Sequence, residues 1–272
     1  DEELRDRFLS MRYRRRGRTP RKRVSEIRFE QHRELLESLM EWISDRGRLP
    51  ENDEFPDAPA IIDEFGSIKR AFSLIRRVTD AEEWDAVKQS QAEDLLVYLA
   101  LVRFRRRPRF SSLPLGLQRD LRAFFRSYKR GCEQADELLF RVGEAEAIDE
   151  TCQQSQIGLL QENSLWLHRS AVEDLDPLLR IYEGCARAYI GEREDANIVK
   201  LHRFSGKVSY FACPDFEQDA HPALKWCVKL SLRSRDVEWF DSSQNPDPLV
   251  LHSKERFVST EFPGREKFSK LT

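Results

Sequence analysis

The chain has 272 residues, of which 40% are hydrophobic and 35% are charged. The length exceeds what one small core needs, and the hydrophobic share is enough to build cores, so we expect two ordinary domains with a heavily ionic surface. No apolar run approaches the roughly 18 residues of a membrane-spanning helix, and the first residues lack the apolar centre of a signal peptide. These features exclude a membrane partner and favour a soluble, cytoplasmic protein.

The distribution of charge indicates a kind of binding partner, and the cysteines indicate the redox compartment. Residues 1–130 contain 29 Lys and Arg against 23 Asp and Glu, a net charge of +6, whereas the remainder has 17 against 25, a net charge of −8. A polyanion is therefore expected to dock on the first half. The five cysteines are widely spaced and form no C-x-x-C pair, which predicts free, mostly buried thiols in a reducing compartment and no metal site or other cofactor.

The first half has helical periodicity. A helical pattern over residues 3–16 leads into the basic linker "RRRGRTPRKR", and residues 25–47 place apolar side chains at helical spacing between Ser25, a candidate N-cap, and Gly47, a stop signal. Two short helical patterns follow on either side of Gly66, and longer ones cover residues 80–107 and 115–140. We predict a basic tail over residues 1–24 and a helical DNA-binding domain over residues 25–155.

From about Leu165 the period becomes that of strands. "SLWLH", "NIVKLHRF" and "GKVSYFA" are typical of strands, the last two joined by a Ser-Gly turn, and "WCVKLSLRSRDVEWFD" predicts a half-buried antiparallel strand and its return. "LDPLLRIYEGCARAYI" predicts a helix packed on them. The predicted class is α+β: an all-helical N-terminal half with a helix-turn-helix-like element, then a small mixed, largely antiparallel sheet with packed helices over residues 156–272.

Gly66 interrupts an apolar helical pattern in "AIIDEFGSIKRAFSLIRRV". Glycine costs about 1 kcal/mol relative to alanine inside a helix, so we predict that Gly66 ends one helix and that Ser67 caps the next. The polar face of the second helix and its flanks carry Lys69, Arg70, Ser73, Arg76 and Arg77. Two interpretations stay open: a helix-turn-helix that inserts this face into the major groove, or a helical hairpin with a solvated basic face.

A resemblance favours the first interpretation. "RGRLPENDEFPDAPAIIDEFGSIKRAFSLI" is similar to the small DNA-binding repeat that accompanies some homing endonucleases, in which G-R-x-P leads into an isoleucine-rich helix, then F-G-S, then a second helix. The matching residues are Gly47, Arg48, Pro50, Phe65, Gly66, Ser67 and Ala71. The resemblance covers about thirty residues and implies that Arg48 and Ser67 contribute to DNA binding.

Two further basic runs, "RYRRRGRTPRKR" and "RFRRRPRF", lie in the same half. Such runs are commonly solvated faces or flexible tails, but three basic segments together supply enough phosphate contacts for strong, salt-dependent affinity. The candidate DNA contacts in these runs are Arg14, Arg15, Arg16, Arg105, Arg106 and Arg107.

The C-terminal half carries histidines, carboxylates and a lysine near predicted strand ends. These residue types serve general acid-base or metal-assisted hydrolysis. The candidates are His168, Asp215, His221, His252, Lys254 and Glu255. Separation along the chain says nothing about their proximity, and lone histidines in strands are more often packed residues with satisfied hydrogen bonds, so both interpretations stay open.

Segments along nearly the whole chain, among them "FRSYKRGCEQADELLF", "WLHRSAVEDLDPLLRIYEGCARAYIGE", "CPDFEQDAHPAL" and "NPDPLVLHSKERFV", resemble the DNA phosphorothioation-associated methyltransferases. These are prokaryotic proteins linked to the islands that put sulfur into the DNA backbone. The chain departs from the family at Cys213, Glu217 and Ala220, and the segment from Asn245 to Glu255 is one residue longer. The resemblance implies DNA as a partner, phosphorothioated or not, and other proteins of the same modification and antiviral defence island.

The methyltransferase name belongs to an N-terminal region of that family. The chain has no glycine-rich strand-to-helix turn of the kind that holds S-adenosylmethionine, and its first sixteen residues resemble the tail of that region, so we expect a fragment that does not methylate DNA by itself. The leading hypothesis is a DNA-binding module of such a system. The alternatives are a nuclease or other hydrolase acting on modified DNA, and a protein–protein assembly module that docks through the acidic C-terminal half.

Overall fold

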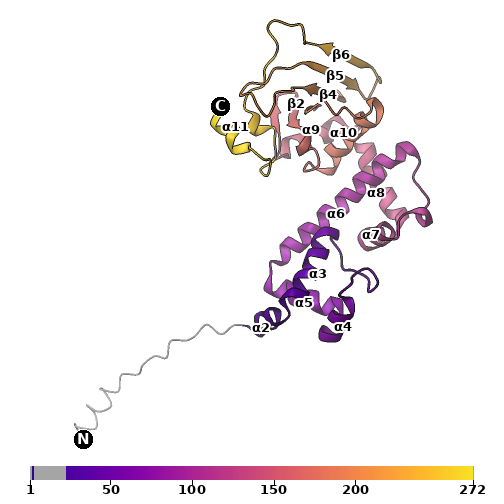
Figure 1. The fold of residues 1–272 in the computed structure, drawn as a ribbon. Coiled ribbons are helices and arrows are strands. Elements are labelled where there is room, and N and C mark those ends of the chain that lie inside the picture. The colour runs from indigo at the N-terminus through magenta and orange to yellow at the C-terminus, as the bar shows by residue number, and fades with distance from the viewer. Residues whose placement is uncertain (1, 3–22, 272) are drawn as a thin grey trace. The chain divides into compact units, whose positions relative to one another are not determined.

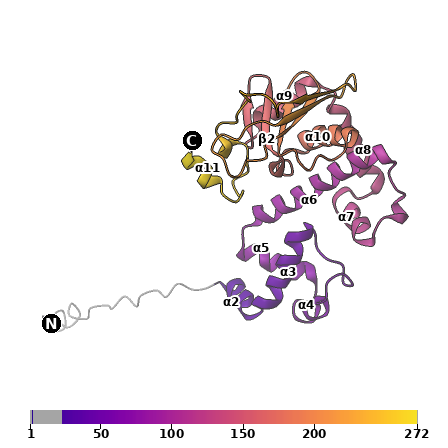
Figure 2. The same ribbon diagram turned by 45° about the horizontal axis from the view of Figure 1, so that its top comes forward.

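The computed structural model describes Glu2 and residues 23–271, which form two compact units that divide between Gln89 and Ser90 (Figures 1 and 2). The helix predicted over residues 3–16, most of the predicted basic tail, and Arg14, Arg15 and Arg16 lie outside the described residues. The described chain is α+β, as predicted: helices come first, and an antiparallel sheet with packed helices follows. No helix in this part of the chain is both long and apolar enough to cross a membrane.

The first unit is a small helical core. It is built from α2 (Val24–Gln31), α3 (Arg33–Arg46), α4 (Ala58–Phe65), α5 (Ile68–Val78) and the start of α6 (Ala81–Val102). Leu36 and Leu39 of α3, Ile61 of α4 and Ile75 of α5 are fully buried in it. Burying each such side chain contributes about 1.5–3 kcal/mol, so these positions determine which faces of the helices remain for solvent.

Residues 25–47, predicted as one helix, form two. α2 ends and α3 begins at His32, whose backbone leaves the helical region at φ −121° and ψ 29°. The His32 ring packs edge-on against Phe65 with 5.3 Å between ring centres, and its Nε2 lies 3.1 Å from Oε1 of Glu64. Phe29 of α2 reaches the core. Tertiary contacts with α4 therefore outweigh the local helical preference.

The second unit contains helices that the sequence assigned to the N-terminal domain. These are α7 (Leu115–Phe125), α8 (Tyr128–Arg141) and α9 (Ala145–Gln154), preceded by the short η1 (Arg103–Arg105) and η2 (Phe110–Ser112). The helix α10 (Pro177–Ile190) is buried on two adjacent sides: Ile181 and Cys185 join the core of α6, α7 and α8, whereas Leu178 and Tyr182 join the core beneath the sheet. Because two layers share this helix, no boundary between separate cores falls at residues 155 and 156.

The sheet has six strands in chain order, and every neighbouring pair is antiparallel. The strands are β1 (Leu159–Gln161), β2 (Ser164–His168), β3 (Ile198–His202), β4 (Lys207–Ala212), β5 (Trp226–Ser231) and β6 (Val237–Asp241). All predicted strands are present; β1 was not predicted, and the sheet is antiparallel throughout instead of mixed. The segment that carries η3 (Arg169–Ala171) and α10 brings the chain back beside β2, so this long connection creates no parallel pair.

The strand register separates two faces. Leu165 lies opposite Leu201, and Val208 opposite Leu230, and these side chains face the core that α9 and α10 share with the sheet. A second core on the other face is formed by C-terminal side chains, including Phe216, which pack against the sheet. This segment carries η4 (Lys254–Arg256) and α11 (Arg265–Leu271), and the figures show α11 away from α9 and α10 (Figures 1 and 2).

Candidate nucleic-acid interface

The turn between α4 and α5 has the conformation that the sequence predicts. Gly66 is left-handed, with φ 80°, and its N–H donates to the carbonyl of Ile62 at 2.8 Å. Glycine suits this position because a side chain makes the left-handed region costly. Ser67 is extended, and its Oγ accepts from the N–H of Arg70 at 3.2 Å. The predicted helix stop and N-cap are both confirmed.

A groove of about 630 Å³ opens beside this turn. Arg70, Ser73 and Arg77 of α5 line it at positions i, i+3 and i+7, which share one face of a helix. Arg28 of α2 adds a third guanidinium, which donates to the carbonyl of Glu64 at 3.0 Å and lies 4.9 Å from the ring centre of Phe65. Three arginines against one glutamate make the groove electropositive, and Arg70 and Arg77 are exposed.

This face is rotated from the one that the sequence favoured. The sequence centred the polar face on Lys69, Ser73 and Arg76, but Arg76 forms an ion pair with Asp85 of α6 at 2.9 Å. Lys69 is exposed and does not line the groove. Asp85 draws Arg76 toward α6, and the groove keeps Arg70 and Arg77, which were predicted as the flanks.

Arg48 is not available for DNA, contrary to what the homing-endonuclease resemblance implies. Its side chain is 6% exposed, and it forms a two-fold ion pair with Glu54, with nitrogen–oxygen distances of 2.7 and 2.8 Å. It also donates to the carbonyl of Leu49 and lies 5.1 Å from the ring of Trp42. A bidentate pair of this kind fixes a guanidinium strongly, so Arg48 holds the loop between α3 and α4.

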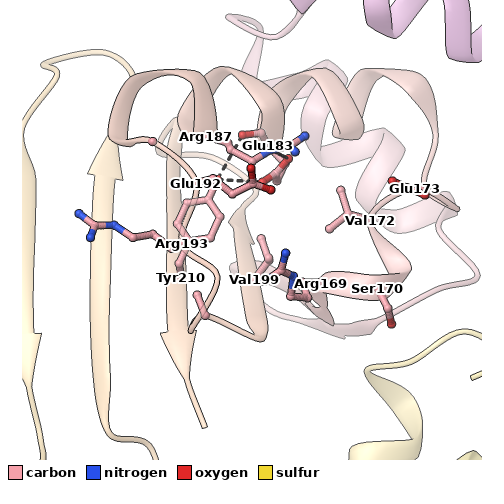
Figure 3. A pocket seen from close by; sticks show the side chains of 12 residues that line it. Arg169, Ser170, Val172, Glu173, Glu183, Arg187, Glu192, Arg193, Val199 and Tyr210 are labelled. Carbon is pink, nitrogen blue, oxygen red and sulfur yellow. Dashed lines mark hydrogen bonds and ion pairs between the residues drawn. The ribbon is translucent and has the colours of Figure 1, made fainter. Parts of the chain in front are cut away.

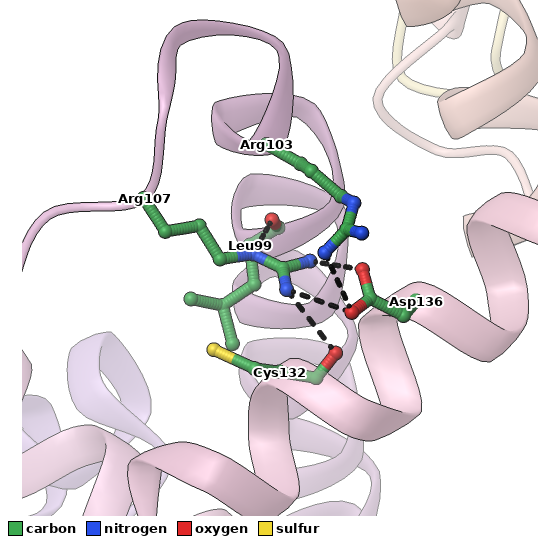
Figure 4. Close-up of polar contacts among 5 residues, drawn as sticks. All are labelled: Leu99, Arg103, Arg107, Cys132 and Asp136. Atoms are coloured by element: carbon green, nitrogen blue, oxygen red, sulfur yellow. Dashed lines mark hydrogen bonds and ion pairs between the residues drawn. The ribbon is translucent and has the colours of Figure 1, made fainter.

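Arg107, from the predicted run "RFRRRPRF", is likewise an internal anchor (Figure 4). It reaches both oxygens of Asp136 on α8, at 2.7 and 3.1 Å, and donates to the carbonyl of Leu99 at 2.8 Å. Arg103 approaches the same carboxylate at 2.9 Å. The run is therefore split: Arg107 ties the loop to α6 and α8, whereas Arg105 and Arg106 stay exposed.

Two of the predicted catalytic residues are packed around one phenylalanine. The His168 ring stacks on Phe216 with 4.8 Å between ring centres, and its Nδ1 accepts from the N–H of Ser170 at 3.3 Å. Burial, assisted by the charge of Arg169, lowers the pKa of His168 to about 4. Lys254 is buried, its Nζ donates to the carbonyls of Phe216 and Asp219, and burial lowers its pKa. Through these contacts, His168 and Lys254 stabilise the packing of the C-terminal segment.

Of the four other predicted catalytic residues, two histidines lie close together. His221 and His252 are exposed, with 4.6 Å between ring centres. Asp215 is exposed, and its carbonyl accepts from the N–H of Asp219 at 2.9 Å in a turn. Glu255 is half-buried in η4. Among the described residues, no group of three or more histidine, cysteine or acidic side chains is arranged to hold a metal ion.

A buried carboxylate in the second unit, that of Glu183, is not among the site residues predicted from the sequence (Figure 3). Glu183 of α10 borders a cavity of about 380 Å³; its Oε1 accepts from the hydroxyl of Tyr210 at 3.0 Å, and its Oε2 lies 3.3 Å from Nε of Arg187. Burial raises its pKa, an effect that Arg187 and Tyr210 partly offset. The sequence feature that could have indicated this residue is a single glutamate within the largely apolar helix "LLRIYEGCARAYI".

The remaining arginines of this cavity are engaged within the chain. Arg169 donates to the carbonyl of Glu194 at 2.9 Å. Arg193 extends away from Glu183 in Figure 3, and its guanidinium carbon lies 5.7 Å from the ring centre of Trp239. Because its cations already have partners, the cavity offers less free positive charge than the groove beside Gly66. Comparison with protein-family models, with curated proteins and with solved structures finds no match to this chain.

Proposed function

We propose that the first unit binds duplex DNA, with α5 as the helix that enters the major groove. The observation that carries the proposal is the electropositive groove beside Gly66, in which exposed Arg70 and Arg77 share one face of a helix that begins at a tight left-handed turn. A short helix after such a turn is the arrangement by which helix-turn-helix proteins present side chains to base edges.

The spacing on α5 supports this geometry. Arg70 and Arg77 are seven residues apart, which places them about 10 Å apart along the helix axis at about 1.5 Å per residue. Successive nucleotides of one DNA strand are about 3.4 Å apart, so the two guanidiniums span about three base steps. Each can pair with a phosphate or with the O6 and N7 edge of guanine, and a good bidentate pair of the latter kind contributes about 1–3 kcal/mol of discrimination.

The link to phosphorothioate rests on the family resemblance alone. If this protein serves a phosphorothioation system, its DNA partner carries a sulfur in place of a non-bridging phosphate oxygen. A pair of duplexes with the same sequence, one modified and one not, tests this part of the proposal in a direct binding titration. Equal affinity for the two duplexes would mean that the protein does not distinguish phosphorothioate from phosphate, and the proposed DNA binding would be unaffected.

The binding proposal is tested by fluorescence anisotropy of a labelled duplex over a series of salt concentrations. The double variant Arg70→Ala with Arg77→Ala should bind more weakly at every salt concentration, and the slope of log K against log salt should fall by about 0.9 for each lost phosphate contact. The charge-matched control is Lys88→Ala with Lys225→Ala, which also removes two cations, from exposed residues outside the groove. No binding by the native protein at low salt, or equal binding by the double variant and the control, would refute the proposal.

A further inference from the structure

The motif around Gly66 recurs 60 residues later in the second unit. "FGSIKR" spans Phe65 to Arg70, and "FRSYKR" spans Phe125 to Arg130, with phenylalanine, serine, lysine and arginine at the same four places. The apolar positions correspond as well: Ile61 and Leu121 are both fully buried four residues before the phenylalanine. The pattern F-x-S-x-K-R is therefore present twice at a fixed offset.

The backbone repeats together with the sequence. α7 ends at Arg126, which is left-handed with φ 65°, just as α4 ends at Gly66 with φ 80°. Ser127 then caps α8: its Oγ accepts from the N–H of Arg130 at 3.2 Å, the same contact and distance as between Ser67 and Arg70. The two helices of each copy pack against each other. The second copy is thus the same helix–turn–helix unit.

The exposed charges of the two copies agree at the start of the second helix and differ after it. Lys129 and Arg130 are exposed, like Lys69 and Arg70. Lys129 has one weak ion pair, 3.7 Å from Glu133, in which both side chains are largely exposed. The later positions diverge, because Glu133 and Glu137 stand where the first copy has Ser73 and Arg77. The second copy therefore keeps a basic start and replaces the rest of the stripe with carboxylates.

Arg126 adds a third exposed cation exactly where the first copy has glycine. The left-handed conformation is unfavourable for a residue with a side chain, and strained positions of this kind tend to occur where a side chain has a function. The loop before this element contributes too: Arg107 fastens it to Asp136 of α8 (Figure 4), and the exposed Arg106 directly precedes Arg107 in the chain. The turn is thus a concentrated basic surface.

We infer that residues 115–141 are a second DNA-binding element, which contacts the phosphate backbone through Arg126, Lys129 and Arg130 and reads no bases. This inference rests on the proposed DNA binding of the first unit. Carboxylates at Glu133 and Glu137 would repel the phosphates that border a groove, so this helix does not enter one. Basic side chains at its start still pair with phosphates, and such contacts supply affinity without sequence preference.

The test uses the full chain and labelled duplexes of two unrelated sequences. Lys129→Ala with Arg130→Ala should weaken binding to both duplexes by the same factor and should lower the salt slope by about two. The matched control is Lys88→Ala with Lys225→Ala, which removes the same charge from exposed residues outside both motifs. A variant pair that behaves like this control overturns the inference.

Arg126→Gly separates binding from folding. Glycine relieves the left-handed strain, as Gly66 does in the first copy, so the variant should unfold at a higher urea concentration and still bind DNA more weakly. Unchanged affinity of this variant likewise overturns the inference. If these variants bind normally while the Arg70 and Arg77 variant is impaired, the inference fails and the proposed function stands. If the Arg70 and Arg77 variant binds like the native protein, the proposed function fails, and the inference that rests on it fails with it.

Discussion

Replacing Arg107 by alanine should destabilise the second unit without a direct effect on a DNA contact. The Arg107 side chain is 12% exposed and makes three well-formed contacts, two with Asp136 and one with the carbonyl of Leu99. Breaking a buried ion pair by removing one partner costs about 3–5 kcal/mol. Here Arg103 still neutralises Asp136 from 2.9 Å, so we expect the lower end, a loss of about 3 kcal/mol in the free energy of unfolding.

The assay is equilibrium unfolding in urea, followed by far-ultraviolet circular dichroism. Arg107→Lys should lose about half as much, since lysine keeps the charge but lacks the fork that reaches both carboxylate oxygens. Arg105→Ala is the matched control from the same run; its side chain is exposed, so its effect should stay within about 0.5 kcal/mol. If Arg107→Ala unfolds like the native protein but binds DNA more weakly, Arg107 is a DNA contact and the structural interpretation is refuted.

Three further substitutions test other features. Arg48→Ala should cost about 3 kcal/mol in urea unfolding, the low end for breaking a buried pair, because it removes the guanidinium that pairs with Glu54 while the Glu51 N–H still donates to that carboxylate; Arg48→Ala with Glu54→Ala should recover part of that loss, and an additive double variant would contradict the pairing. Gly66→Ala should cost about 1–2 kcal/mol for the left-handed turn, so a neutral result in thermal unfolding would argue against the turn geometry. Glu183→Gln should change the pH dependence: burial raises the pKa of Glu183 in the folded state, so native stability falls as pH rises from the ordinary pKa of glutamate through the raised one. The variant should gain stability relative to the native protein above that window and not below it, and parallel pH profiles would refute the assignment.

Short-range signals in the sequence specify the turn between α4 and α5. Gly66 and Ser67 specify a helix end and a helix start through backbone freedom and side-chain capping, which act within four residues. Apolar and aromatic runs bounded by turn residues placed β2 to β6 correctly. The half-buried pattern predicted for the last two strands was wrong, because β5 is buried on both faces between two cores and β6 is exposed along its length. The repeat F-x-S-x-K-R is present in the sequence, but its periodicity predicted one helix over residues 115–140, and the structure divides that segment at Arg126 into α7 and α8.

Which arginines form ion pairs within the chain depends on the packing of segments that are distant in the sequence. Arg48, Arg76 and Arg107 belong to basic segments that look equivalent in sequence to Arg70 and Arg77, yet each of the three pairs with a carboxylate within the chain. These partners lie six to twenty-nine residues away along the chain, and the fold of a loop or the packing of two helices brings each pair together. The division of the units follows the same principle, since α10 joins a helical layer to the sheet through two adjacent faces of one apolar helix. Periodicity shows that such a helix is buried, but only packing shows between which layers.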